Sequence, residues 1–306
     1  MKKQKIIIGS RGSKLALIYA QKAKDAILKN IVISPEDIQI KKIETKGDQE
    51  QNSRLSDIGG KGLFSTNIEK ELLEEKIDIA IHALKDLPAV ETKGLITNSF
   101  LERNDPREAL ITKNNKKLME LKSNPTIGTS SFRREFQVKN KRRDINCKLI
   151  RGNVDTRLKK LYEDEYDAII LSYAGLKSLS IKHNVSEVFS VADFIPSAGQ
   201  GIIALQCRMN DDRIISILKK VNHKNTFYRA SAERNVLKVL EGSCETAVGV
   251  HAQIQDEQLI LEAELFSLDG SQRYYDKKVS EIKDAEEIGK KLGEILKKKS
   301  DNSYKK

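Results

Sequence analysis

The sequence predicts an α/β protein with two domains built on mainly parallel sheets, followed by a smaller α+β domain. The chain has 306 residues, which is more than one ordinary domain holds. Short apolar runs alternate with amphipathic helical segments as far as residue 207, and this order is typical of parallel sheets covered by helices on both faces. After residue 210 the order changes to two helices, alternating strands and a final helix.

The first part of the chain alternates strands and helices. Residues 5–9 form a predicted strand, and Ser13 is a candidate N-cap for a helix over residues 14–29. The remaining predicted strands cover residues 38–45, 77–82, 108–112, 126–128, 148–151, 168–172 and 201–207. The remaining predicted helices cover residues 66–75, 131–141 and 153–164. The last part is expected to hold helices over 211–221, 226–240 and 284–298, with strands within 247–278.

The formal charge of +11 requires either an anionic partner or an ordinary explanation. Part of it is ordinary, because the lysine-rich residues 297–306 are expected to form a frayed tail. Binders of single-stranded nucleic acid interleave basic residues with aromatic stacking platforms, whereas aromatic residues are 5% of this chain and tryptophan is absent. We therefore expect no nucleic-acid partner and favour small carboxylates or phosphates as ligands.

The chain carries no sign of a membrane or secretory segment. No apolar run approaches the ~20 residues that cross a bilayer. The basic N-terminus is followed by only a short apolar stretch at residues 6–8, without the length or cleavage site of a secretory signal. Mean hydropathy is −0.50. We expect a cytoplasmic protein that does not contact membranes.

The cysteines and histidines predict no metal site. Cys147, Cys207 and Cys244 are an odd number and widely spaced, which excludes a complete disulfide framework and matches no zinc pattern. The four histidines form no cluster with them. Cys244 stands apart because Gly242 and Ser243 place it in a loop, where a thiol can be exposed and ionisable. Buried packing, the commoner role of a cysteine, remains the alternative.

One local pattern occurs three times at predicted strand–helix junctions. Arg11 ends the first strand and Ser13 opens the next helix; GTSSFRR at 128–134 and RGNVDTR at 151–157 repeat the combination. A helix start offers unpaired N–H groups, hydroxyls add donors, and arginine binds carboxylates in a bidentate manner. Since open parallel sheets bind ligands at the carboxyl ends of their strands, the pattern predicts a cleft for a ligand with many carboxylates. A capped helix beside a surface arginine is the plainer alternative at any single junction.

Two further segments are candidates for function, one because of its charged residues and the other because of its glycines. HALKDLP at 82–88 follows a predicted strand, and its Asp86 is either a turn-capping residue or a carboxylate held in the cationic cleft to stabilise a developing cation. The glycine-dense segment GGKGLF at 59–64 lacks the spacing of a phosphate-binding P-loop. We expect it to be a mobile gating loop that contains Lys61 and Phe64.

These residues resemble the hydroxymethylbilane synthase (porphobilinogen deaminase) family. The shared motifs occur in the order of the family: Arg11, KGLF at 61–64, HALKDLP at 82–88, ERNDPRE at 102–108, GTSSFRR at 128–134, RGNVDTR at 151–157, DAIILSYAGL at 167–176, PSAGQG at 196–201 and EGSCE at 241–245. The last part of the chain matches only loosely.

The resemblance implies a fold and an activity. Two domains are expected to resemble type II periplasmic binding proteins, with mainly parallel central sheets. Domain 1 would comprise residues 1–101 and 200–219, domain 2 residues 105–195, and domain 3, which would carry the cofactor attachment loop, residues 224–306. The implied enzyme is a monomeric transferase that joins four porphobilinogen molecules head to tail, each losing ammonia, and releases linear hydroxymethylbilane by hydrolysis.

The resemblance also implies roles for individual residues. A dipyrromethane cofactor would be bound through a thioether to Cys244. Asp86 would contact pyrrole N–H groups and stabilise the cation left when ammonia departs. The cofactor carboxylates would be held by Lys85, Thr129, Ser131, Arg133 and Arg134. The substrate and growing chain would be held by Arg11, Ser13, Arg151, Arg157 and Gln200.

Two departures and two alternatives accompany the resemblance. Many relatives carry arginine where this chain has Ser178, so one cationic contact is either missing or supplied by Lys177. The attachment loop reads Ser-Cys-Glu-Thr-Ala rather than Gly-Cys-x-Val-Pro, which predicts a less rigid loop. A cytoplasmic two-lobed anion-binding protein would use the arginines without needing Asp86 or Cys244, and a nucleic-acid binder would use the charge without needing a cleft.

Overall fold

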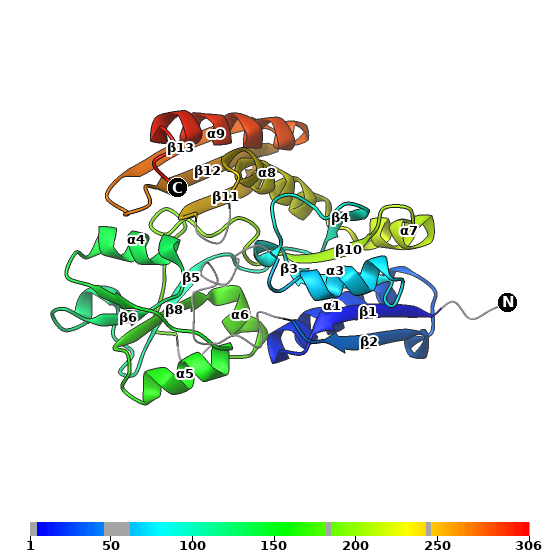
Figure 1. Ribbon diagram of the computed structural model, residues 1–306, viewed down its shortest axis with the longest axis horizontal. Helices are drawn as coiled ribbons and strands as arrows, with labels where there is room; N and C mark the ends of the chain where they lie inside the picture. The colour runs from blue at the N-terminus through cyan, green and yellow to red at the C-terminus, as the bar shows by residue number, and fades with distance from the viewer. Residues whose placement is uncertain (1–4, 46–61, 182–184, 243–245, 306) are drawn as a thin grey trace.

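The structure, a computed structural model, describes residues 5–45, 62–181, 185–242 and 246–305. It contains two five-stranded sheets and one three-stranded sheet. Figure 1 shows the N-terminal sheet with its helices on the right, the second sheet on the left and the C-terminal part above both.

The N-terminal sheet is mainly parallel. Its strand order is β2 (Ile38–Ile43), β1 (Ile6–Arg11), β3 (Ile79–Ala83), β10 (Ile203–Arg208) and β4 (Leu95–Phe100). β1 runs parallel to β2 and β3, whereas β10 is antiparallel to both of its neighbours. Helices α1 (Lys14–Asn30), α3 (Thr66–Leu73) and α7 (Asp212–Val221) belong to this part of the chain.

The second sheet repeats this arrangement. Its order is β7 (Asn146–Lys148), β6 (Thr126–Gly128), β8 (Ala168–Ser172), β5 (Glu108–Thr112) and β9 (Glu187–Val188). Here too the first three strands are parallel and the fourth, β5, is antiparallel to both neighbours. Its helices are α4 (Phe132–Lys141), α5 (Val154–Tyr162) and α6 (Tyr173–Ser178).

The chain crosses between these two sheets twice, and each crossing supplies the antiparallel strand. β5 follows β4 of the N-terminal sheet, and β10 returns to that sheet after β9. The two crossings lie side by side, because the backbone N–H of Asn104 in the first donates a 2.8 Å hydrogen bond to the carbonyl oxygen of Gly201 in the second. The prediction of two α/β units with mainly parallel sheets is confirmed.

The C-terminal part is α+β, as predicted. β11 (Val248–Gln255), β12 (Gln258–Phe266) and β13 (Arg273–Glu281) form an antiparallel sheet, which packs against α8 (Lys224–Leu240) and α9 (Ala285–Ser300). Short 3-10 turns lie at Pro35–Asp37, Leu84–Asp86, Leu118–Glu120 and Ile282–Asp284.

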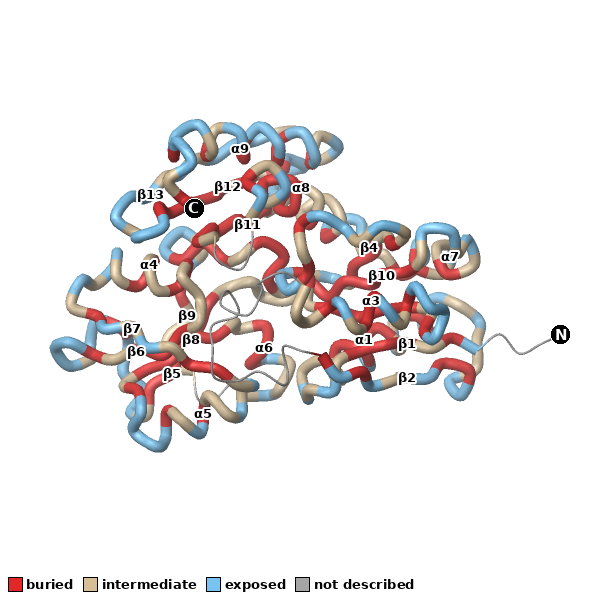
Figure 2. The backbone as a smooth tube through the Cα atoms, in the orientation of Figure 1, coloured by how far each residue is buried: buried red, intermediate tan, exposed pale blue. Residues whose placement is uncertain are grey.

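The apolar strands form cores on both faces of each large sheet, as Figure 2 shows by the buried central strands and more exposed outer helices. In β1, Ile6 and Ile8 are fully buried on the side of α1, whereas Ile7 packs with Ile68 and Leu72 of α3. A strand that is buried on both faces must be apolar throughout, which explains the unbroken run of isoleucines.

Three details differ from the prediction. The lysine-rich C-terminus is not a frayed tail: α9 continues to Ser300, and the nearly buried Tyr304 donates a hydrogen bond from Oη to the carbonyl oxygen of Leu240, 3.1 Å away. Arg151 does not end a strand, because β7 ends at Lys148. Strand β4, the short β9 and helix α6 were not predicted.

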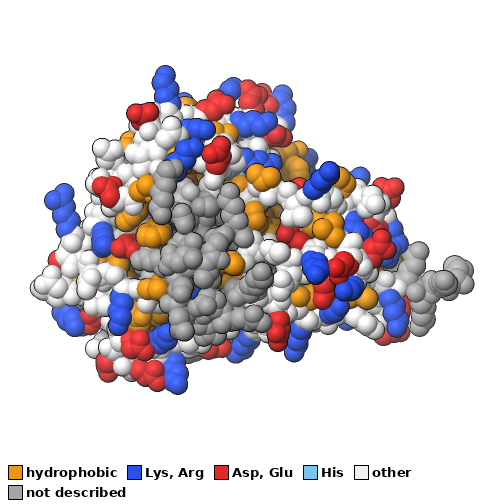
Figure 3. Space-filling view, viewed as in Figure 1, with side chains coloured by type: hydrophobic (Ala, Val, Ile, Leu, Met, Phe, Trp, Pro, Cys, Tyr) orange, Lys and Arg blue, Asp and Glu red, His pale blue; other side chains and the backbone are white. Residues whose placement is uncertain are grey.

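Charges are well mixed on the face seen in Figure 3, where lysine and arginine side chains alternate with aspartate and glutamate among the described residues. No helix in the described ranges is long and apolar enough to cross a membrane.

Candidate active site

A cavity of about 700 Å³ lies between the two large sheets. Its wall is formed where strands end and helices begin, at the end of β1, the turn after β3, and the first residues of α1, α4, α5 and α6. This position, at the carboxyl edges of parallel strands, is the one at which open α/β sheets bind ligands. The volume falls within the range of about 300–1,000 Å³ found for small-molecule sites.

Positive charge dominates the wall of this cavity. Seven of its lining residues are cationic and three are acidic. The cationic residues are Arg11, Lys14, Lys85, Arg133, Arg134, Arg151 and Arg157, and the acidic ones are Glu44, Asp86 and Asp155. Ser13, Ser131, Gln200 and Phe64 also line it. The structure thus brings together most of the residues selected from the sequence.

The first junction has the predicted form. Arg11 is the last residue of β1, and Ser13 is the N-cap of α1, with Oγ accepting a hydrogen bond from the backbone N–H of Ala16. The guanidinium carbon of Arg11 lies 4.0 Å from the centre of the Phe64 ring, within the range of a cation–π contact. The Phe64 ring, which lines the same cavity, therefore helps to hold the Arg11 guanidinium in place.

At the second junction, the side-chain hydroxyls of Ser131 and Thr129 accept hydrogen bonds from backbone N–H groups at the start of α4. Ser131 is the N-cap of α4 and accepts a hydrogen bond at Oγ from the N–H of Arg134. Thr129 is buried, and its Oγ1 accepts a hydrogen bond from the N–H of Ser131 at 3.2 Å. Unlike Ser131, Thr129 does not line the cavity.

Both arginines of this junction are paired with Glu108, the first residue of β5. Its Oε1 lies 2.6 Å from Nη2 of Arg133, and its Oε2 lies 2.8 Å from Nη2 of Arg134. Arg133 also donates to Gln137 and to the carbonyl of Ile195, so both of its Nη atoms are committed to protein partners. Arg134 donates through Nη1 to the carbonyl of Ile170, and its buried Nε has no hydrogen-bond partner within the described ranges. Arg134 therefore retains one side-chain donor, Nε, without a partner in the described part of the chain.

The sequence reasoning missed Glu108. A carboxylate at the start of the apolar strand EALIT, within the motif ERNDPRE, was the available signal. A charged group that begins a buried strand needs a partner of opposite charge. The paired arginines of GTSSFRR are the nearest such groups in the fold.

The third junction differs from the other two. Asn153 is the N-cap of α5, but its side chain caps no N–H group. The turn is instead held by Arg157, whose Nε donates to the carbonyl oxygen of Gly152 at 2.8 Å. Gly152 has φ +108°, a left-handed conformation that favours glycine. Arg151, which is buried, and Arg157 both line the cavity.

Lys85 and Asp86 enter the cavity from the 3-10 turn Leu84–Asp86, directly after β3. Nζ of Lys85 donates a 3.1 Å hydrogen bond to Oε1 of Gln200, and Nε2 of Gln200 donates to the carbonyl oxygen of Pro106. Gln200 thus ties this turn to one crossing of the chain. The side chains of Lys85 and Asp86 are accessible to water and line the cavity.

Burial, together with neighbouring positive charges, lowers the pKa values of two cationic residues of the cavity. Burial, followed by the nearby charge of Arg134, lowers the pKa of Lys85 to about 8, although Asp86 acts in the opposite direction. Burial and the charges of Arg134 and Arg151 lower the pKa of Arg157 to about 10. Part of each decrease comes from neighbouring positive charges, and the cavity wall holds more cationic than acidic side chains. A ligand that brings several carboxylates would supply the balance.

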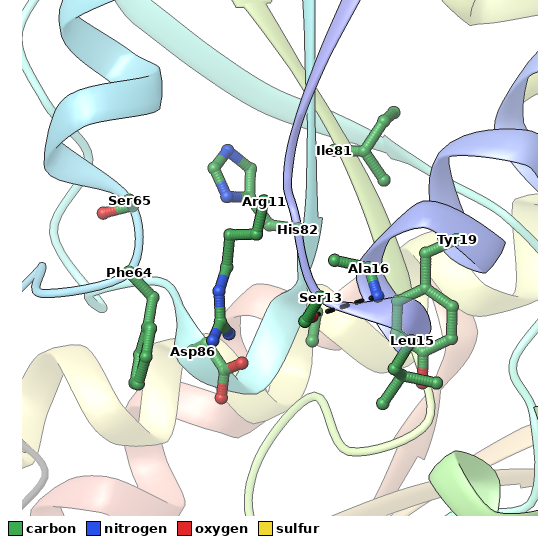
Figure 4. Close-up of a pocket in the computed structure, with 11 residues that line it drawn as sticks. Arg11, Ser13, Leu15, Ala16, Tyr19, Phe64, Ser65, Ile81, His82 and Asp86 are labelled. Carbon is green, nitrogen blue, oxygen red and sulfur yellow. Dashed lines mark hydrogen bonds between the residues drawn. The ribbon is translucent and has the colours of Figure 1, made fainter. Parts of the chain in front are cut away.

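A smaller pocket of about 60 Å³ opens beside Asp86, and Figure 4 shows its lining residues. The Arg11 side chain reaches down toward the Asp86 carboxylate, with the Phe64 ring on one side and the His82 ring above. Ser13 and Tyr19 come from α1 and complete the polar part of the wall. Burial and the charge of Asp86 raise the pKa of Tyr19 to about 12, so its hydroxyl remains protonated.

Two of the selected residues lie outside the described residues: Cys244 and Lys61. The predicted gating loop is likewise described only from Gly62, so its motion stays a prediction. Cys207 is buried within β10, and burial raises the pKa of its thiol to about 11. Within the described ranges, no group of histidine, cysteine and acidic side chains could hold a metal ion.

Two family matches cover most of the chain. Residues 6–216 match the family described as porphobilinogen deaminase, dipyromethane cofactor binding domain. Residues 227–298 match the family described as porphobilinogen deaminase, C-terminal domain. The chain is 40% identical over 294 residues to the porphobilinogen deaminase of Alkaliphilus metalliredigens, covering 95% of this chain and 92% of that protein. It is 41% identical over 272 residues to that of Chlorobium phaeovibrioides, covering 89% and 86%.

Among solved structures, the chain is similar to periplasmic binding proteins. One is the probable amino-acid ABC transporter extracellular-binding protein ytmK from Bacillus subtilis, with a TM-score of 0.46 and 14% identity over 72% of this chain and 90% of that chain. Another is a periplasmic binding protein of Salmonella typhimurium, with a TM-score of 0.41 and 12% identity over 71% of this chain and 92% of that chain.

Proposed function

The chain belongs to the porphobilinogen deaminase family and is a hydroxymethylbilane synthase, and from this premise we propose how its own residues perform the reaction. The enzyme is a transferase of tetrapyrrole biosynthesis that joins four porphobilinogen molecules head to tail with loss of four ammonia molecules. Water then releases linear hydroxymethylbilane. The domain boundaries at 1–101 with 200–219, 105–195 and 224–306 belong to the same proposal.

Asp86 is the catalytic residue of this proposal. As ammonia leaves the aminomethyl group of porphobilinogen, positive charge spreads over the methylene carbon and the pyrrole nitrogen. A fixed carboxylate near that N–H group stabilises the transition state more than the ground state, which is the condition for raising turnover. The observation that carries the proposal is the single turn that places Lys85 and Asp86 inside a cavity of seven cationic side chains.

The cationic side chains would hold the carboxylates of substrate and cofactor. Each pyrrole unit carries an acetate and a propionate, for which paired guanidinium donors are well suited. Arg134, whose Nε has no partner among the described residues, and Lys85 are the best-supported holders of the cofactor. Ser131 and Arg133 would support them in the same wall, and Thr129 would act from behind it by accepting the hydrogen bond from the N–H of Ser131. The substrate and growing chain would contact Arg11, Ser13, Arg151, Arg157 and Gln200.

The donor set fits a dipyrromethane cofactor. The buried Nε of Arg134 lacks a partner in the described part of the chain, and the lowered pKa values of Lys85 and Arg157 point to charge that a polycarboxylate would neutralise. When bound, this group supplies the nucleophilic pyrrole carbon to which the first substrate is joined. Its thioether link to Cys244 is part of the proposal, supported by the match of EGSCE to the attachment motif.

The intact mass of the purified protein tests the proposal. The expected result is a covalent addition equal to two linked pyrroles, absent from Cys244→Ala, together with ammonia release from porphobilinogen by the modified protein. An unmodified, inactive wild-type protein that still binds small carboxylates would favour the alternative, a two-lobed anion-binding protein. We further propose a cytoplasmic monomer without a nucleic-acid partner, consistent with the mixed charges of Figure 3.

A further inference from the structure

His82 ends a buried chain of hydrogen bonds that the reaction as described above does not use. The chain begins at Glu69 in α3, passes through Gln206 in β10 and reaches the imidazole at the end of β3. All three side chains are buried. Polar groups this deeply buried need complete hydrogen bonding, so their donors and acceptors must match along the chain.

The direction of this chain follows from Glu69. Its Oε2 accepts hydrogen bonds from Oγ of Ser65 at 3.3 Å and Oγ1 of Thr92 at 3.0 Å, and its Oε1 accepts from Nε2 of Gln206 at 3.0 Å. A carboxylate surrounded by three donors can only accept. Gln206 must therefore point its NH₂ group at Glu69, which leaves its Oε1 facing His82.

The tautomer of His82 follows in turn. Its Nε2 lies 3.2 Å from Oε1 of Gln206, an atom that can only accept, so Nε2 carries the hydrogen. In a neutral imidazole the other nitrogen, Nδ1, then holds a lone pair. Burial lowers the pKa of His82 to about 4, which keeps the ring neutral at physiological pH.

The lone pair faces the small pocket beside Asp86. His82 lines this pocket and Gln206 does not, so the edge of the ring opposite Nε2 is the one turned toward it. Nδ1 has no hydrogen-bond partner among the described residues and is not fully enclosed by protein. The pocket volume of about 60 Å³ exceeds the ~10–15 Å³ that a cavity needs to hold one water molecule.

We infer that His82 accepts a hydrogen bond at Nδ1 from the aminomethyl nitrogen of porphobilinogen and receives the departing ammonia in this pocket. The inference rests on the proposed function. The carbon–nitrogen bond of the protonated amine breaks, its electron pair leaves with nitrogen as neutral ammonia, and the positive charge stays on the methylene–pyrrole system beside Asp86. His82 gains no proton, because the ammonium N–H it accepts from becomes an ammonia N–H.

The inference gives Glu69 and Gln206 a positioning role. They hold His82 so that an acceptor, not a donor, meets the positively charged leaving group. A donor at Nδ1 would repel it. The same chain joins the residues after the glycine-rich segment, at Ser65, to the segment after Asp86, at Thr92. Two polar residues of the pocket lining, Ser65 and His82, are thus connected by hydrogen bonds through Glu69 and Gln206.

The first experiment reads the tautomer directly by nitrogen NMR on protein with labelled histidine, with the His82 signals assigned from His82→Gln. The expected result at neutral pH is a protonated Nε2 and an unprotonated Nδ1. His223 is an internal reference, because its Nδ1 accepts a hydrogen bond from the N–H of Thr226. Glu69→Gln keeps the volume but lets the Gln206 amide turn, and should produce a mixture of His82 tautomers. A protonated Nδ1 in the wild type would overturn the inference.

The second experiment measures ammonia release in a single turnover. In His82→Gln the amide NH₂ can still donate to Gln206, but the remaining amide oxygen does not occupy the position of Nδ1. A hydrogen bond to a charged group is worth a factor of roughly ten to a hundred, so release should slow by that amount while the covalent addition, loaded beforehand and checked by mass, is retained. Unchanged release in His82→Gln overturns the role of His82. Absence of release from wild type would instead count against the proposed function.

Discussion

Oε2 of Glu108 lies 2.8 Å from Nη2 of Arg134, while Oε1 of the same carboxylate lies 2.6 Å from Arg133. One buried carboxylate therefore serves two consecutive arginines in the wall of the active-site cavity. Together, the guanidinium groups and the cavity cations lower the pKa of Glu108 to about 2, against the effect of burial. Arg133 and Arg134 look equivalent in the sequence, but their remaining hydrogen-bond partners in the structure differ.

Glu108→Gln should destabilise the protein strongly. Two buried guanidinium groups would lose their common counter-charge, and breaking a buried ion pair from one side typically costs about 3–5 kcal/mol. The midpoint of urea unfolding measures the effect. Glu287→Gln is the control, because it removes one exposed i,i+4 pair with Lys291 and should change the free energy of unfolding by less than about 0.5 kcal/mol. Equal midpoints for the two variants would mean that the carboxylate is not needed.

The cavity arginines should differ in what their loss impairs. Arg134→Leu should reduce cofactor loading, because it removes the buried donor that has no partner within the described ranges. Arg11→Leu and Arg151→Leu should keep the loaded cofactor and stall elongation, with binding weakened roughly ten- to a hundredfold. Intact mass reports loading, and porphobilinogen consumption reports elongation. The same occupancy and the same block in all three variants would refute this division.

Cys244 should carry the cofactor alone. Cys244→Ala is expected to give an unmodified protein without turnover, whereas Cys147→Ala and Cys207→Ala stay modified. Cys207 is a poor candidate, because burial raises the pKa of its thiol to about 11 and keeps it protonated at physiological pH. Peptide mapping after proteolysis locates the addition. An adduct on a peptide that contains Cys147 or Cys207 would disprove the assignment.

Carboxylate binding should weaken as the pH rises through about 8. Lys85 has a pKa lowered to about 8, so it loses its charge near that pH, whereas an unfolded chain keeps a lysine charged to about 10.4. The folded state therefore binds fewer protons between those values, and its stability from this group rises with pH in that window while its affinity for anions falls.

Calorimetric titration of Cys244→Ala with a small pyrrole dicarboxylate from pH 7 to 9 checks this expectation. Lys85→Arg in the same background keeps its charge throughout and should remove the loss of affinity near pH 8. A loss of affinity in Lys85→Arg as large as in the parent protein would show that another group is responsible.

The alternation of apolar runs and amphipathic helices was enough to predict the two α/β domains, because buried strands such as β1 must be apolar on both faces. Strand β4, with the sequence LITNSF, escaped because three of its six residues are polar and consecutive, which interrupts the apolar pattern. The tail after residue 297 was misjudged from its lysines. The buried Tyr304, whose hydroxyl bonds to Leu240, holds it in place.

The cationic residues of the site could be predicted because each follows a strand or opens a helix. The residues with which the buried side chains pair could not be identified from local sequence patterns. Glu108 is 25 residues from Arg133, and the chain from Glu69 to His82 passes through Gln206 in a strand that returns from the second sheet. Such pairings depend on how the chain crosses between sheets, which local patterns do not encode.

Asp86→Asn should leave folding and substrate affinity nearly unchanged while turnover collapses. The amide keeps the shape of the carboxylate, and the turn Leu84–Asp86 is held by backbone hydrogen bonds, including one from the N–H of Leu87 to the carbonyl oxygen of Leu84. Loss of one preorganised electrostatic group typically lowers the rate by ~10²–10³. Asp86→Glu keeps the charge but displaces it by one methylene, so partial activity is expected.

Because cofactor assembly requires the same chemistry, the Asp86 variants must be loaded before assay and their occupancy checked by mass. Single-turnover ammonia release is then the decisive measurement, with Asp193→Asn as a control that removes an exposed carboxylate paired with Lys141. The charge at Asp86 matters most when positive charge develops beside it in the transition state. The defect should therefore lower the rate at which the enzyme–substrate complex reacts and leave the substrate concentration needed for half-saturation unchanged. Near-normal release from loaded Asp86→Asn would reduce Asp86 to a residue that shapes the turn, and the stabilisation of the cation would then have to come from another group in the cavity.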